Sequence, residues 1–169
     1  PIAMNMLEYD PSKPEEKTFI VNEMQAIFNR LFPPESMGPM FEQYMRNALL
    51  LLMEDREHPG TLMEVPRVFT DSVWRKAKIE RISNPAVVDF WEKEAVKSTG
   101  EHSLANMAPY ITSKFNNFIA NDYVRPIIAQ RQSAFRFRQV MDEGKILLVN
   151  LSKGRIGDIN AGLLGMVVV

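Results

Sequence analysis

Apolar residues recur at helical spacing along most of this chain. Between Glu15 and Leu31, and again between Pro39 and Met53, they fall three or four positions apart, which is typical of helices with one buried face. The same spacing continues in four later segments, 71–82, 86–97, 101–121 and 134–143. The pattern therefore predicts a mainly α fold, built as a multi-helix bundle.

Polar residues stand where several of these helices are expected to begin. Asp71, Asn84 and Ser133 each come directly before a helical segment, where a side-chain oxygen accepts a hydrogen bond from a free amide of the first turn. Pro85 strengthens the signal at Asn84, since proline is favoured at the first helical position. Gly144 is expected to end the last of these helices.

Two helix faces are predicted from the same spacing. In the helix over 71–82 we expect Val73 to face the core and the cations Arg75 and Lys78 to face solvent. Charged side chains are rarely buried unless they are paired, which supports this assignment. Phe19 is predicted to lie on the buried face of the helix over 15–31.

One segment near the end departs from the helical pattern. Five of the six residues from Ile146 to Leu151 are apolar, which is typical of a strand buried on both faces of a parallel sheet. A glycine-containing loop follows, and then Asp158 is placed to cap a helix. Residues 1–7 are the only plausible partner for this strand, so we expect one or two short strands and a piece of a larger α/β protein.

Charge changes the picture only through its distribution. The net charge of the 169 residues is −1, but residues 1–64 carry −6 and residues 65–169 carry +5. A uniformly basic nucleic-acid binder is therefore excluded, while a basic face confined to the second half remains open. The chain has no cysteine, which excludes disulfides and thiolate metal sites and fits a reducing cytoplasm.

Motifs for catalysis are missing from the sequence. It contains no G-x-x-x-x-G-K-[ST] phosphate loop and no G-x-G-x-x-G dinucleotide motif. Its two histidines, His58 and His102, lie far apart without neighbours at the spacing of a metal site or a Ser-His pair. For this chain alone we expect no catalytic residue, no metal site and no enzyme activity.

Two sets of cations are candidate binding residues. Lys153 and Arg155 lie in the loop after the predicted strand, at the edge where open α/β sheets bind ligands, and are candidates for nucleotide or subunit-interface contacts. The alternative is a surface loop with two solvated cations. The second set alternates with aromatic residues over 114–138, an arrangement that suits stacked bases and phosphates, and consists of Lys114, Arg125, Arg131, Arg136 and Arg138. Its alternative is a core of aromatic residues with cations facing solvent.

Several separated motifs resemble one family in order along the chain. They are Gly38-Pro39 with Glu42, Arg46–Leu50, Pro66-Arg67, Asn84–Trp91 and Asp142–Gly154. Together they resemble the conjugative coupling ATPases of type IV secretion systems, whose relatives carry the type IV secretion DNA-binding domain. The resemblance implies a RecA-like α/β motor with an inserted all-α domain, and six subunits around DNA. Residues 12–143 would be the insertion, and residues 1–11 and 144–169 motor segments on either side of it.

The resemblance also sets expectations for cofactors and partners. ATP and Mg²⁺ would belong to the full-length protein, whose phosphate loop would precede residue 1 and whose acidic metal-binding strand would follow residue 169. The expected partners are single- or double-stranded DNA, a relaxase or an accessory protein. Contact with the membrane would come only through segments outside this chain, so the domain is expected in the cytoplasm, with the full-length protein at the inner face of the cell membrane. The expected role is recruitment of DNA or its bound protein; the alternative is a helical protein–protein module unrelated to a motor.

Overall fold

The computed structural model describes residues 2–97 and 103–169. Within these ranges the helices are α1 (Glu15–Leu31), α2 (Pro39–Glu54), α3 (Val65–Thr70), α4 (Ser72–Ile79), α5 (Pro85–Asp89), α6 (Leu104–Ile119), α7 (Arg125–Ile128), α8 (Phe137–Asp142), α9 (Lys153–Ile156) and α10 (Asp158–Val168). A π-helical turn, Phe90–Ala95, continues α5, and short 3-10 turns cover Pro34–Ser36 and Leu62–Glu64. The predicted mainly α fold is confirmed, and no strand occurs in the described ranges.

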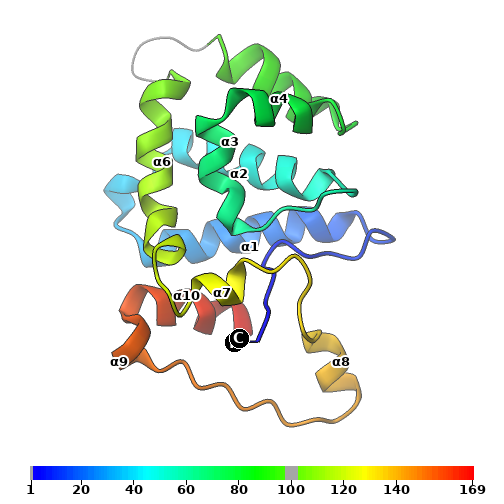
Figure 1. The fold of residues 1–169 in the computed structure, drawn as a ribbon, viewed down its shortest axis with the longest axis vertical. Coiled ribbons are helices and arrows are strands. Elements are labelled where there is room, and N and C mark those ends of the chain that lie inside the picture. Colours follow the sequence, from blue (N-terminus) through cyan, green and yellow to red (C-terminus); the bar gives the residue numbers. More distant parts are fainter. Residues whose placement is uncertain (1, 98–102) are drawn as a thin grey trace.

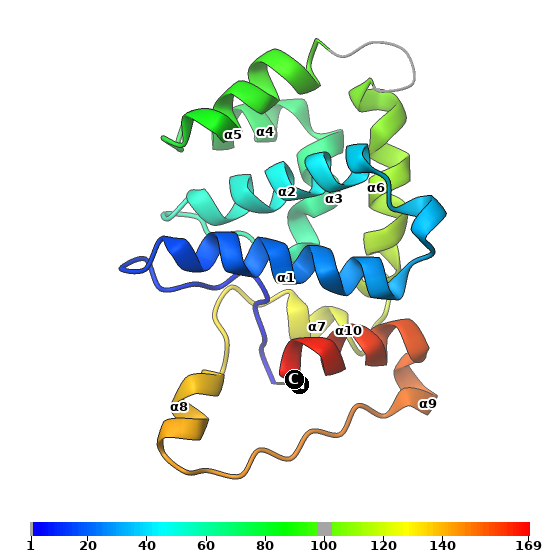
Figure 2. The same ribbon diagram turned by 180° about the vertical axis from the view of Figure 1, so that it is seen from behind.

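The helices form a bundle with one loose end. Figures 1 and 2 show α1 and α2 side by side across the middle, with α4 and α5 beyond α2 and α7, α9 and α10 beyond α1, while α3 and the longer α6 run across this stack. α8 stands apart from the bundle and buries none of its side chains. No helix in the described part of the chain is long and apolar enough to cross a membrane.

An aromatic cluster lies at the centre of the bundle. The ring centroid of Phe28 in α1 lies 4.8 Å from that of Phe115 and 5.9 Å from that of Phe118, both in α6. Phe41 in α2 completes the group, with its centroid 6.3 Å from that of Phe28. All four side chains are fully buried. The predicted inner faces of these three helices therefore meet at one point.

Two of the four predicted side-chain caps form as expected. The Asp71 carboxylate accepts a hydrogen bond from the Trp74 amide at 2.9 Å, and Asn84 accepts one from the Ala86 amide at 3.2 Å. The prediction for Ser133 is wrong, because α8 begins only at Phe137 and has no side-chain cap. A partner far away in the sequence competes successfully, since the Ser133 hydroxyl accepts a hydrogen bond from the Asn5 amide at 3.0 Å.

The predicted faces of α1 and α4 are partly wrong. Arg75 and Lys78 are buried, whereas Val73 is 80% exposed and Phe19 is 64% exposed. The Arg75 guanidinium donates to the Val68 carbonyl at 2.6 Å, at the end of α3, where helix carbonyls lack partners within the helix. Arg75 and Lys78 therefore each donate a hydrogen bond to an acceptor inside the bundle, Arg75 to the Val68 carbonyl and Lys78 to the Asp55 carboxylate.

The two ends of the chain lie together at the base of the bundle. The Met4 amide donates to the Ile127 carbonyl at 2.9 Å, and the Ala134 amide donates to the Ala3 carbonyl at 3.0 Å. The predicted pairing of residues 1–7 with a strand at 145–151 is therefore wrong for residues 2–7. Side chains from both ends enter the same core as α1 and α2, namely Met6, Leu7, Leu163 and Leu164. The division of the chain into an all-α domain and motor segments, at residues 11 and 143, stays a prediction. The expected start of a helix at Glu101 lies outside the described residues.

Candidate functional site

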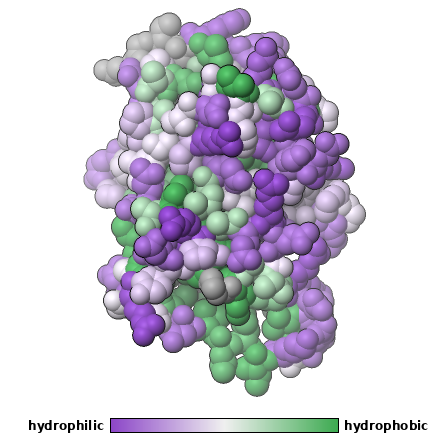
Figure 3. Space-filling view, viewed as in Figure 1, coloured by the Kyte–Doolittle hydropathy of each residue, from purple (hydrophilic) through white to green (hydrophobic). Residues whose placement is uncertain are grey.

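Residues 145–151 form an extended apolar segment that the bundle leaves uncovered. Ile146 and Leu148 are 87% and 89% exposed, whereas Leu147 and Val149, which alternate with them, are 37% and 45% exposed. Figure 1 shows the segment running along the lower edge of the molecule, and Figure 3 shows apolar atoms projecting there. The backbone groups of residues 146–151 form no hydrogen bond with any other described residue.

The predicted strand at 146–151 is therefore wrong as a formed element. The apolar pattern and the extended backbone suit a strand, but a strand also needs neighbours that supply backbone donors and acceptors. Hydrogen bonds to residues nearby in the sequence form only at the two ends of the segment. The Lys145 amide donates to the Val140 carbonyl at 2.9 Å, and the Ser152 amide donates to the Asn150 side chain at 3.0 Å.

The loop with Lys153 and Arg155 folds into the short helix α9. Lys153 lies 3.2 Å from Asp158, and both side chains are mostly exposed. The Arg155 side chain is exposed and has no carboxylate within ion-pair distance in the described chain. Asp158 is the first residue of α10 and caps nothing, so its predicted cap is wrong, although the predicted helix is present. Contact of Lys153 or Arg155 with a nucleotide or a neighbouring subunit stays a prediction.

The proposed DNA-binding cations do not share one surface. Lys114 is buried, with its ammonium 4.0 Å from the ring centroid of Tyr110 and hydrogen-bonded to the Tyr110 carbonyl at 3.1 Å. Burial lowers the pKa of Lys114 from its ordinary value. Phe115 and Phe118 belong to the central cluster, so for these residues the core alternative is the correct one. Lys114 is excluded as a phosphate contact in this conformation.

The four arginines of that set are exposed but differ in their surroundings. Arg125 pairs with Asp122 at 2.7 Å, and Arg138 pairs with Asp142 at 2.9 Å. Arg131 and Arg136 take part in no ion pair within the described chain. Arg136 and Arg138 line one groove, whereas Arg131 lies at a different hollow. DNA contact by these residues stays a prediction.

The groove beside Arg136 is a large hollow between α8 and the N-terminal part of the chain. It encloses about 660 Å³, with residues 3–10 and the start of α1 on one side and residues 133–143 on the other. Phe135 and Phe137 are half-buried in its wall, and their ring centroids lie 5.1 Å apart in an edge-to-face arrangement. Five carboxylates and three cations line it, and Lys145 just outside the lining pairs with Glu143, so the groove has an excess of one negative charge. A polyanion such as DNA is repelled by this excess of carboxylates.

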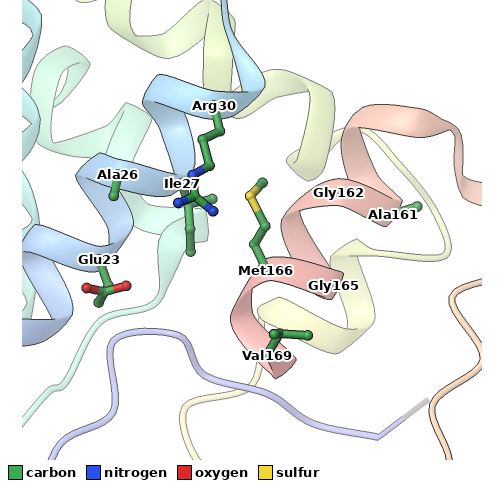
Figure 4. A pocket seen from close by; sticks show the side chains of 9 residues that line it. All are labelled: Glu23, Ala26, Ile27, Arg30, Ala161, Gly162, Gly165, Met166 and Val169. Carbon is green, nitrogen blue, oxygen red and sulfur yellow. The ribbon is translucent and has the colours of Figure 1, made fainter.

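A second cleft lies between α1 and α10. It encloses about 530 Å³, and Figure 4 shows its lining, with Arg30 and Met166 extending between the two helices. Gly162 lets α10 approach α1, because a Cβ there would lie 2.9 Å from the Leu31 side chain. α1 and α10 are therefore tightly packed at Gly162, which borders the cleft.

No family model, no curated protein and no solved structure matches the chain. Within the described residues, no group of three or more histidine, cysteine or carboxylate side chains is placed to hold a metal ion. The features of the described chain that bear on function are the segment at 145–151, the loop after it and the groove.

The sequence prediction missed a buried charge cluster at the end of α2. The Asp55 carboxylate, 1% exposed, accepts hydrogen bonds from Lys78 at 2.9 Å and from Arg81 at 3.0 Å. Lys78 also donates to the His58 carbonyl at 2.7 Å. Burial on its own raises the pKa of Asp55, but the bonds from Lys78 and Arg81 outweigh it and hold the pKa below its ordinary value. The cluster joins α4 to α2 and is part of the scaffold.

Proposed function

We propose that this chain is the helical substrate-recruiting domain of a hexameric DNA-translocating ATPase of conjugation or type IV secretion. Residues 144–169 would supply a strand, a loop and a helix to the sheet of its motor. The observation that carries the proposal is the segment 146–151, which has extended backbone, apolar side chains on both faces and no backbone partner in the described chain. Such a segment is stable only when strands flank it and apolar layers cover it.

Two features support an insertion in a larger unit. The N-terminal segment and α10 lie at the same end of the bundle, so both connections to a neighbouring domain leave from one place. The segment 146–151 projects from that end as well. ATP and Mg²⁺ would be held by residues outside this chain, and Lys153 and Arg155 would lie at the carboxyl end of the added strand, where α/β sheets bind ligands.

Charge favours a protein-borne substrate over naked DNA. Phosphate neutralisation dominates nucleic-acid affinity, yet Lys114 is buried, Arg125 and Arg138 are paired, and the groove at Arg136 is acidic overall. The domain would therefore recruit DNA chiefly through a relaxase or accessory protein, on the cytoplasmic side of the membrane. The same groove is the observation that favours the alternative, a helical protein–protein module without a motor.

The reading frame that encodes this chain distinguishes the two functions. We expect a phosphate-loop motif upstream of residue 1 and an acidic strand downstream of residue 169, and we expect the product of the whole frame to hydrolyse ATP faster when DNA is present. Replacing the phosphate-loop lysine by alanine is the control, and should abolish turnover. A frame that encodes neither motif, or a product without ATPase activity, would reject the motor and leave the interaction module.

A further inference from the structure

We infer that the groove between residues 3–10, the start of α1 and α8 binds an extended segment of a partner protein in which lysine or arginine alternates with apolar residues. The inference rests on the proposed function only in naming the partner as the protein that carries the DNA. The groove itself is defined by this chain, and its volume of about 660 Å³ suits a few residues of peptide.

Charge indicates the basic part of the partner. Glu8 accepts a hydrogen bond from the Ser133 amide at 2.8 Å, and Asp10 accepts hydrogen bonds from the Ser12 hydroxyl at 2.7 Å and the Ser12 amide at 2.9 Å. These donors are neutral, and neither carboxylate has a cation within ion-pair distance in the described chain. The bonds from Ser12 lower the pKa of Asp10, so its charge persists. Two carboxylates therefore face the groove without a direct ion-pair partner, with Lys13 and Arg136 acting on Asp10 only at longer range.

The walls indicate the apolar part of the partner. Phe135 and Phe137 on one side face a wall that includes Phe19, which is 64% exposed, and Ile20, which is half-buried. None of the α8 side chains is fully buried, so this wall remains accessible to a partner. Apolar side chains inserted between these walls would be removed from water, and a lysine or arginine could stack on an aromatic ring. The carboxylates and the aromatic walls thus lie in one groove, where a single segment with basic and apolar side chains could contact both.

The remaining charges of the groove are already compensated. Glu16 pairs with Lys13 at 3.8 Å, Asp142 pairs with Arg138, and Glu143 pairs with Lys145. Arg136 is the remaining cation of the lining, and it is outnumbered by the two carboxylates that have no ion-pair partner, Glu8 and Asp10. A nucleic acid would find one free cation here, whereas a basic peptide finds two free carboxylates. Because the carboxylates outnumber the cation, the groove favours a basic peptide over a nucleic acid.

The test is a fluorescence anisotropy titration of the chain at low ionic strength with three labelled probes. They are a peptide of alternating lysine and leucine, the same peptide with glutamate in place of lysine, and an oligothymidine. We expect the lysine peptide to bind and the other two to bind much more weakly. The double variant Glu8→Gln, Asp10→Asn keeps both hydrogen-bond acceptors and should raise the Kd of the lysine peptide about tenfold, since two ion pairs with the peptide are lost.

A matched variant separates this site from a general charge effect. Glu35→Gln with Glu57→Gln removes two exposed carboxylates outside the groove and should leave the Kd unchanged. Phe137→Ala should weaken binding of the lysine peptide without changing the far-ultraviolet circular dichroism, because Phe137 is only half-buried and lies outside the core of the bundle. Equal Kd values in the groove variant and its control, or equal affinity for the two peptides, would overturn the inference. Tight oligothymidine binding that the Glu8 and Asp10 changes strengthen would assign the groove to nucleic acid instead.

The two hypotheses fail separately. A reading frame without motor motifs, together with intact peptide binding, would reject the motor and leave the groove. A product with DNA-stimulated ATPase activity but no binding of the lysine peptide in the groove would support the motor and reject the groove as a peptide site.

Discussion

Replacing Phe28 by alanine should lower the free energy of unfolding by about 3–5 kcal/mol. Phe28 is fully buried, and its ring lies against Phe41 of α2 and against Phe115 and Phe118 of α6. Removing it leaves a cavity where three helices meet, and the neighbouring rings can fill it only in part. Such a loss is a large fraction of the roughly 5–15 kcal/mol that stabilises a typical domain. Urea unfolding followed by circular dichroism measures it.

Phe19→Ala is the matched control in the same helix. Phe19 is 64% exposed, so its truncation should change the unfolding free energy by no more than about 0.5 kcal/mol. If the two variants lose similar stability, the central cluster is not where the structure places it.

Replacing Asp55 by asparagine should cost about 3–5 kcal/mol at neutral pH. Asparagine has nearly the same shape, but it leaves the ammonium of Lys78 buried without its counterion. Asp122→Asn is the control, because Asp122 and its partner Arg125 are exposed and such a pair contributes at most about 1 kcal/mol. Urea unfolding of both variants at neutral pH gives the comparison.

The Asp55 variant also predicts a pH dependence. The pKa of Asp55 is lower in the folded chain than its ordinary value, so its contribution is complete above the unfolded-state pKa of about 4 and is lost as the pH falls through the folded-state pKa. The stability difference between the wild type and Asp55→Asn should therefore shrink towards acid pH. A difference that stays constant from neutral to acid pH would contradict the ion-pair explanation.

Local sequence signals predicted the helices well because their causes are local. The three-to-four spacing placed α1 and α2, and Asp71 and Asn84 cap the helices that follow them. The burial of Lys78 was missed because its counterion, Asp55, lies 23 positions earlier, just after the end of another helix. Long cationic side chains also carry aliphatic stems that bury readily, so charge alone is a weak guide to exposure.

The candidate site was less predictable because it depends on contacts between residues that lie far apart in the sequence. Sequence spacing put Lys114 beside the arginines, but the helix turns it inwards against Tyr110. The groove joins residues 3–10 to residues 133–143, and its charge appears only when both segments are in place. The apolar run at 146–151 was recognised correctly as apolar and extended, but pairing depends on neighbours that the described chain does not supply.

The central claim is that residues 146–151 complete a sheet outside the described chain. Amide hydrogen exchange, followed by mass spectrometry, tests it by comparing these six residues in the isolated chain and in the product of the whole reading frame. Buried amides of α2 serve as the internal reference and should be protected in both samples. We predict near-intrinsic exchange in the isolated chain and exchange slowed at least about a hundredfold in the larger product. Equally fast exchange in both samples would show that the segment never becomes a strand.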